Sequence, residues 1–207
     1  MLLILSGILA AGLCLDKRGG DAAGQDEDAY DDLIFESCQK YMPSGWDWLI
    51  LKGLIKQESK FDPRASSGNT AGLMQFTSGT AKSVGLPPQK RDNPDLAVPA
   101  GVRYMRKLWD VWQDLDDGPP AWNRTKFALA SYNAGPGRVR QAREGAGGTS
   151  SYDRLEQGLP SHTQNHVAHV MEFFKEYRKS GRYRRSSGSL RRRNGSVRFW
   201  INPMKQY

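Results

Sequence analysis

Residues 49–86 read LILKGLIKQESKFDPRASSGNTAGLMQFTSGTAKSVGL and decide what kind of fold this chain builds. Apolar residues at the start recur at helical spacing and place one carboxyl group, Glu58, at the end of a predicted helix. Pro63, Gly68 and Gly72 then interrupt helical structure and predict a loop. A carboxyl group where a buried helix opens into a loop suits acid/base chemistry, because partial burial favours the protonated form and the loop leaves room for a substrate.

The chain has the size and composition of one globular domain with appendages. It has 207 residues, of which 38% are hydrophobic and 25% are charged, so one core can be built. Residues 175–207 hold 11 Lys and Arg against one Glu, whereas the 174 residues before them hold 19 Lys and Arg against 21 Asp and Glu. The formal charge of +8 is therefore a property of the C-terminal end and not of the predicted domain.

Hydrophobic periodicity predicts a mainly α protein, because no segment shows the sustained alternation of a half-buried strand. We expect helices at 32–41, 46–59, 77–84, 95–113, 124–133, 138–144 and 161–179. Asn93 and Pro94 open the fourth of these helices, and Ser161 is expected to cap the last. These helices form one predicted domain at 33–179, which follows a Gly- and Asp-rich flexible linker at 16–32.

Both ends of the chain differ in composition from this domain. Residues 1–15, MLLILSGILAAGLCL, are apolar but fewer than the about 20 residues of a membrane-spanning helix. Ala10-Ala11-Gly12 resembles a signal-peptide cleavage site, so we expect a signal peptide or membrane anchor, with a buried N-terminal helix as the alternative. Residues 180–207 are rich in Arg, Ser and Gly and are expected to form a disordered basic tail.

The cysteines and histidines do not have the spacing of a metal site. Cys14 and Cys38 are too few for a disulfide framework. His162 and His166 are four residues apart and would share one face of a helix, but no Glu follows His162 as in zinc proteases. We interpret the histidines as solvated or packed side chains, and the spacing predicts no zinc site.

Three motifs, in order, are similar to those of the soluble lytic transglycosylases, which are lysozyme-like enzymes that cleave peptidoglycan. The first motif consists of Glu58-Ser59, Phe61, Pro63, Ala65, Gly72-Leu73-Met74-Gln75 and Thr80-Ala81. The second is Ala130-Ser131-Tyr132-Asn133-Ala134-Gly135, and the third, weaker one is Leu159-Pro160 with Thr163. The family normally has a Glu before this Thr and a Tyr three positions after it, where this chain has His162 and His166.

The resemblance implies a lysozyme-like fold and cleavage of the β-1,4 bond between MurNAc and GlcNAc without water. Glu58 would act first as the acid and then as the base, and the product would carry a 1,6-anhydro-MurNAc end. The reaction that the resemblance implies needs no metal and no cofactor. Tyr132 would point its hydroxyl at Glu58, and Ser59 would support the same residue. The implied substrate-binding residues are Met74, Gln75, Ser67 and Asn133; Ser66 is an alternative to Ser67, and core packing is the alternative role for Met74.

Two other functions fit the same residues. A hydrolysing lysozyme would need a second acid to activate water, for which Asp62 and Asp92 are candidates. A catalytically silent peptidoglycan-binding protein is the third reading; the altered third motif favours it, and the intact Glu58 and Tyr132 oppose it. The partner in all three readings is the glycan strands of peptidoglycan. The apolar segment 1–15 predicts export to the periplasm or cell envelope, with membrane attachment or association with a virion as alternatives. The compact size favours a phage- or secretion-associated setting.

The basic tail predicts an anionic partner, such as an envelope polymer or lipid. Nucleic acid is not favoured, because no recognisable nucleic-acid-binding motif accompanies the tail. Deleting residues 180–207 should weaken adhesion to whole cells at low salt, where charges are least screened, and should leave activity on soluble glycan fragments unchanged. Co-sedimentation with cells over a range of salt concentrations measures this, and unchanged adhesion at low salt would contradict the prediction.

Overall fold

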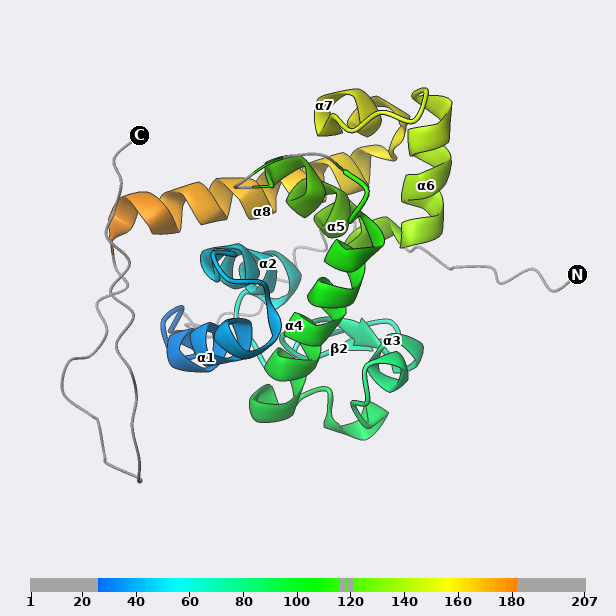
Figure 1. Ribbon diagram of the computed structural model, residues 1–207. Coiled ribbons are helices and arrows are strands. Elements are labelled where there is room, and N and C mark those ends of the chain that lie inside the picture. The colour runs from blue at the N-terminus through cyan, green and yellow to red at the C-terminus, as the bar shows by residue number, and fades with distance from the viewer. Residues whose placement is uncertain (1–25, 116–117, 119–120, 182–207) are drawn as a thin grey trace, which may run out of the picture.

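The computed structural model describes residues 26–115, 118 and 121–181, which form a mainly helical body with one small sheet (Figure 1). The α-helices are α1 (Asp31–Tyr41), α2 (Leu49–Ser59), α3 (Ser78–Ser83), α4 (Pro94–Val111), α5 (Trp122–Ala134), α6 (Pro136–Gly145), α7 (Tyr152–Leu155) and α8 (Ser161–Ser180). Two 3-10 turns are η1 (Pro88–Lys90) and η2 (Glu156–Gly158). The predicted signal segment, most of the predicted linker and nearly all of the basic tail lie outside the described residues.

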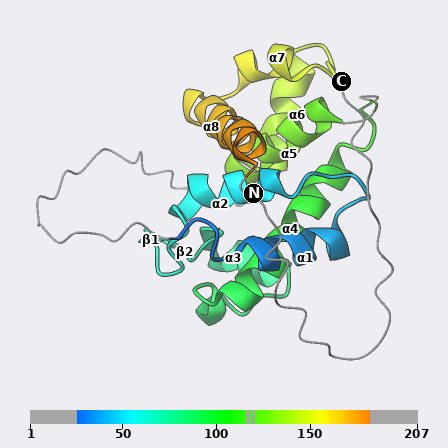
Figure 2. The same ribbon diagram turned by 90° about the vertical axis from the view of Figure 1, so that its left-hand side faces the viewer.

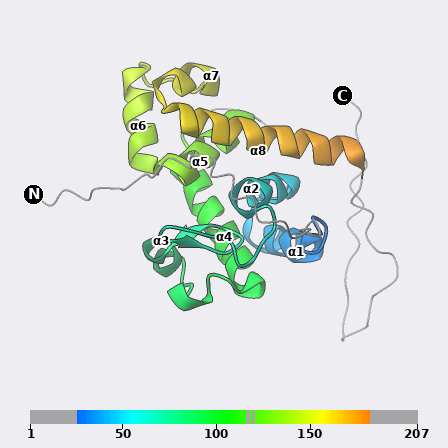
Figure 3. The same cartoon turned by 180° about the vertical axis from the view of Figure 1, so that it is seen from behind.

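Helix α2 lies inside the helical body, where α8 packs along it. Helix α4 packs against both α1 and α5. Figures 1, 2 and 3 show α6 and α7 at one end of the molecule and the sheet with α3 at the other. Among the described helices, none is both long and apolar enough to cross a membrane.

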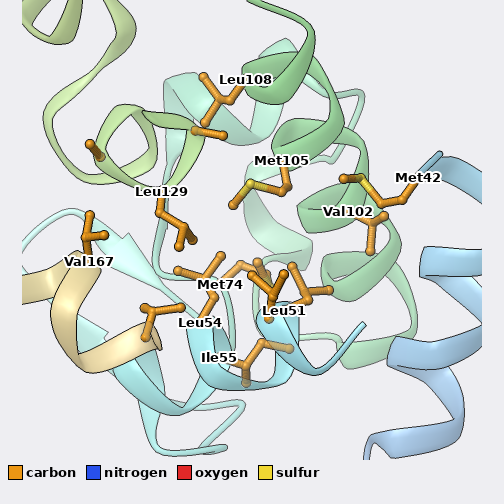
Figure 4. Close-up of a cluster of buried hydrophobic side chains, with 14 of the residues drawn as sticks. Met42, Leu51, Leu54, Ile55, Met74, Val102, Met105, Leu108, Leu129 and Val167 are labelled. Carbon is orange, nitrogen blue, oxygen red and sulfur yellow. The ribbon is translucent and has the colours of Figure 1, made fainter. Parts of the chain in front are cut away.

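The hydrophobic core lies where α2, α4, α5 and α8 meet (Figure 4). Leu51, Leu54 and Ile55 form the inner face of α2 and have no exposed surface. They meet apolar side chains from the three other helices, among them Met105, Leu129 and Val167. Burial of each such side chain contributes about 1.5–3 kcal/mol. Because Glu58 follows Leu54 and Ile55 by four and three residues, it continues this buried face to the end of the helix.

A glycine in the middle of α2 sets the distance between α2 and α8. A Cβ on Gly53 would lie 2.9 Å from the carbonyl oxygen of Val170 and 3.4 Å from Cβ of Phe173. The helix backbones therefore touch at a position where any side chain would separate them. Glycine costs about 1 kcal/mol relative to alanine in a helix interior, so its presence here is explained by the close approach.

A buried lysine fixes the start of the domain. Lys52 of α2 is 2% exposed, and its Nζ lies 2.5 Å from Asp28 Oδ1 and 2.7 Å from Asp31 Oδ1. Next to it, Glu27 pairs with Lys56 at 3.0 Å. Burial of a charge is costly unless the charge is paired, so these contacts hold the two segments together. Part of the segment predicted as a flexible linker, namely Glu27, Asp28 and Asp31, is therefore held against α2.

The structure confirms the predicted helical class and each of the predicted helices, with differences at their ends. Helix α2 begins at Leu49 and not at residue 46. The predicted capping role of Ser161 is wrong, because Pro160 occupies the cap position and Ser161 is the first residue of α8. The sheet escaped prediction because each of its strands, β1 (Ser66–Ser67), β2 (Thr70–Ala71) and β3 (Phe76–Thr77), has two residues, too few to show an alternation.

Replacing Gly53 with alanine should destabilise the protein although alanine is the better helix former. The gain of about 1 kcal/mol in helix propensity offsets only part of the overpacking against a backbone carbonyl group, which costs up to about 3 kcal/mol, so we expect a net loss of up to about 2 kcal/mol in the free energy of unfolding. Urea unfolding of Gly53→Ala measures this.

The matched control is Gly137→Ala in α6, where an added Cβ would meet no atom within 4 Å. This control should keep or slightly raise the free energy of unfolding. Equal stability of Gly53→Ala and the unsubstituted protein would contradict the close-packing argument.

Candidate functional site

Glu58 lies in the last turn of α2, and its side chain is 16% exposed. The helix ends one residue later, and the chain reverses through Lys60 and Phe61, which have left-handed φ values of 52° and 64°. Such conformations cost about 1–3 kcal/mol in non-glycine residues and concentrate at functional sites. Phe61 is 1% exposed, so its burial in the core holds the reversal in place. The carboxyl group is thereby presented at a rigid edge of the core.

The loop after Glu58 is built on a three-stranded antiparallel sheet in the order β1-β2-β3. The side chain of Gln75 joins three separate residues of this loop. The side-chain Nε2 of Gln75 donates to the carbonyl oxygens of Ala65 (3.0 Å) and Gly72 (2.9 Å), and its Oε1 accepts from Thr70 Oγ1 (2.7 Å). Both amide hydrogens are therefore used within the loop. Gln75 was predicted to bind substrate, but in the structure its side-chain amide bonds within the loop.

Arg91, which sequence reasoning missed, fastens the sheet from outside. Its Nη1 donates to the carbonyl oxygens of Asn69 and Phe76, each at 2.7 Å, and its Nε donates to that of Pro88 at 2.8 Å. Gly72 has a φ of 78°, and a Cβ there would collide with the carbonyl group of Arg91. A glycine is thus required where the two segments cross. No sequence pattern around Arg91 predicts this role, because all three acceptors are backbone carbonyl groups, which every residue has.

Tyr132 on α5 connects the second motif to the loop. Its hydroxyl donates to the carbonyl oxygen of Met74 at 2.7 Å, and its ring packs against Phe76 and Tyr104 with centroid distances of 6.0 and 5.4 Å. Burial, and next the negative charge of Glu58, raise the pKa of Tyr132 well above its usual value, so the hydroxyl keeps its proton. Tyr132 therefore lies near Glu58, but its hydroxyl donates its hydrogen bond to the carbonyl oxygen of Met74. The resemblance had implied that this hydroxyl would point at Glu58.

The other predicted site residues lie at different depths. Met74 is 0% exposed and packs beside Leu51 and Leu54 (Figure 4), which corrects its predicted place in the substrate cleft to the core. Ser59 is buried and donates to the carbonyl oxygen of Ile55 at 3.2 Å, so its hydroxyl is bound within its own helix. Ser67 and Asn133 are exposed and accessible to a substrate.

The third motif contributes the residue closest to Glu58. His166 of α8 is 5% exposed, and its Nε2 lies 2.8 Å from Glu58 Oε1. His162, in contrast, is exposed. The interpretation of the histidines as solvated or packed therefore misses the contact of His166. The available signal was its place in the motif, where a histidine stands in the position of a tyrosine.

Helices α5 and α8 are tied together next to this contact. The hydroxyl of Thr163, which is 0% exposed, donates to Asn133 Oδ1 at 2.8 Å. This bond brings the second motif against the third and fixes the turn of α8 that precedes His166. Over the part of the chain that the structure describes, no group of three or more His, Cys, Asp or Glu side chains could hold a metal ion. The site consists of one partly buried carboxyl group, an imidazole and a fastened loop, an arrangement suited to proton transfer.

The chain is similar to several known proteins. The family model of the transglycosylase SLT domain matches residues 34–154. The chain is 35% identical over 136 residues to membrane-bound lytic murein transglycosylase F of Alcanivorax borkumensis, covering 63% of this chain and 27% of that protein. It is 42% identical over 101 residues to the protein of the same name from Desulfosudis oleivorans, covering 48% of this chain and 21% of that protein.

A solved structure has the same fold. The 70 kDa soluble lytic transglycosylase of Escherichia coli superposes with a TM-score of 0.61 and 25% sequence identity, covering 75% of this chain and 25% of that one. The chain thus corresponds to about a quarter of the length of these relatives.

The loop role of Gln75 predicts the effect of Gln75→Asn. Asparagine keeps an amide and tolerates the left-handed φ of 44° at this position, but it is one methylene too short to make the same bonds. Loss of bonds to Ala65 and Gly72 should lower the free energy of unfolding by about 1–3 kcal/mol. Amide hydrogen exchange in residues 65–72 should also become faster.

The exposed Gln89→Asn, in η1, is the matched control and should change neither quantity. If Gln75→Asn raised only KM and left stability and exchange unchanged, Gln75 would be a sugar contact and not the support of the loop.

Proposed function

The chain belongs to the transglycosylase SLT domain family, and from that premise we propose that it is a peptidoglycan lytic transglycosylase in which Glu58 is the single catalytic carboxyl group. The observation that carries the proposal is the position of Glu58 at the end of a buried helix, 16% exposed and hydrogen-bonded to an imidazole. A carboxyl group so placed can give and take a proton at a substrate on the loop side without being open to bulk water.

In the proposed reaction, protonated Glu58 donates its proton to the glycosidic oxygen between MurNAc and GlcNAc while the bond from the anomeric carbon to that oxygen breaks. The carbonyl oxygen of the substrate's own N-acetyl group stabilises the positive charge that develops at the anomeric carbon. The carboxylate of Glu58 then takes the proton of the C6 hydroxyl, and O6 bonds to the anomeric carbon. Glu58 ends the cycle protonated, and the products are a free GlcNAc 4-hydroxyl and a 1,6-anhydro-MurNAc end.

The surrounding residues act mainly by holding this group and the loop in place. Tyr132 holds the carbonyl group of Met74 in the loop, and Ser59 holds the carbonyl group of Ile55 in the last turns of α2, next to Glu58. Gln75 keeps the loop folded. The exposed Ser67 and Asn133 are the proposed direct sugar contacts, Asn133 with its position set by Thr163.

The hydrolytic alternative gains no specific support from the two acids considered for it. Asp62 Oδ1 accepts a hydrogen bond from the backbone N–H of Arg64 at 2.8 Å, which makes it part of a local turn. Asp92 is exposed. Activation of water requires a second carboxylate across the sugar ring from the acid, and neither residue is singled out for that task.

The proposed setting is the cell envelope, with glycan strands as the partner. Export through residues 1–15 and adhesion through the basic tail to an anionic polymer or lipid complete the proposal; the composition of both segments supports it. No metal or cofactor takes part in the proposed steps.

The decisive test is mass spectrometry of peptidoglycan digested with the purified protein. We expect muropeptides one water lighter than the hydrolysed ones, and Glu58→Gln should lower their formation by about 100-fold or more, because the amide has the shape of the acid but no proton to transfer. The exposed Glu172→Gln on α8 serves as the matched control and should behave as the unsubstituted protein.

Reducing-end products without the anhydro ring would show hydrolysis and overturn the proposed chemistry. Binding of peptidoglycan without any product, in the unsubstituted protein as in Glu58→Gln, would mean a binding protein.

A further inference from the structure

The contact between His166 and Glu58 is a feature of the site that the family resemblance did not lead us to expect. The imidazole comes from α8 and the carboxyl group from α2, and the helices run antiparallel, since Gly53 lies against Val170 and Glu58 against His166. The Nε2 to Oε1 distance of 2.8 Å is that of a good hydrogen bond. His166 is 5% exposed, so this bond is shielded from water.

The second ring nitrogen indicates which tautomer is present. Nδ1 of His166 is buried and finds no hydrogen-bond partner among the described residues. A buried N–H donor without a partner is rarer and more costly than an acceptor without one. Nδ1 is therefore the bare nitrogen, and Nε2 carries the hydrogen that it donates to Glu58.

With this tautomer, the two carboxyl oxygens of Glu58 have different roles. Oε1 can accept from Nε2–H whether the carboxyl group is protonated or ionised, since its carbonyl-like oxygen retains lone pairs in both states. The proton that moves during the reaction must then reside on Oε2. The same bond can persist through the acid step and the base step, and it fixes the direction in which Oε2 presents its proton.

We propose that His166 is a positioning residue that holds Glu58 through Nε2–H and Oε1 and reserves Oε2 for proton transfer. This inference rests on the proposed function of Glu58.

The neighbouring polar groups have other hydrogen-bond partners or lie at the surface. From α5, the hydroxyl of Tyr132 donates to the carbonyl oxygen of Met74. On α8 itself, His162 and His169 are the nearest histidines in sequence, and both are exposed. Thr163 and Asn133, which join α8 to α5, bond to each other.

The experiment compares His166→Tyr and His166→Phe, which differ by one hydroxyl group. We expect His166→Phe to lower kcat by about tenfold or more, the size of one lost hydrogen bond to a charged group, with KM changed by less than about threefold. His166→Tyr should recover kcat to within about threefold of the unsubstituted protein near pH 7.5, because a phenol can donate the same bond. Equal kcat values for the two variants would overturn the proposal.

The exposed His169→Tyr on the same helix is the matched control for the substitution itself, and its kcat should equal that of the unsubstituted protein.

Nitrogen NMR of the unsubstituted protein tests the tautomer directly and does not depend on how the variants fold. A protonated Nε2 with an unprotonated Nδ1 at neutral pH is expected for His166, and the reverse would overturn the assignment. The Glu58→Gln control keeps the two proposals distinct. Activity that vanishes in Glu58→Gln but is unaffected by either substitution of His166 refutes only the role of His166, whereas an unsubstituted protein that forms no anhydro product refutes the function itself.

Discussion

The backbone contact between α2 and α8 at Gly53 is the constraint on which the rest of the site depends. It brings the Val170 carbonyl group to a distance that excludes even a methyl group on Gly53. Because the two helices run antiparallel, the contact also sets the separation of Glu58, which lies just over one turn after Gly53, and His166, which lies about one turn before Val170. Close-packed protein interiors transmit small displacements, so the geometry of Glu58 and His166 depends on how the two helices pack.

The polar residues around the loop bind its backbone. Gln75 binds the carbonyl groups of Ala65 and Gly72, Arg91 binds those of Asn69 and Phe76, and Tyr132 binds that of Met74. A loop on strands of two residues has few backbone bonds of its own, so side chains supply the remainder. These bonds hold the loop in place next to Glu58.

The histidine in the third motif places an imidazole against Glu58, where the family normally has a tyrosine. An imidazole and a phenol can each donate one hydrogen bond to a carboxylate, which accounts for the exchange of one for the other at this position. The residue that departs from the family pattern is thus the one that contacts Glu58 directly.

The sequence by itself determined the helical class, the order of the helices, Glu58 at the end of one of them and the family. Periodicity and turn residues are local, and Asn93-Pro94 at the start of α4 marks a helix start without reference to the rest of the chain. Only the tertiary structure decided that Met74 lies in the core, that Gln75 and Tyr132 bond to the loop backbone, and that His166 meets Glu58. Tyr132 and the carbonyl group of Met74 are 58 residues apart, and His166 and Glu58 are 108 residues apart, and local patterns carry no information on such pairs. The bonds of Gln75 lie within one loop, but they depend on how that loop folds back on itself and not on a helical or strand period.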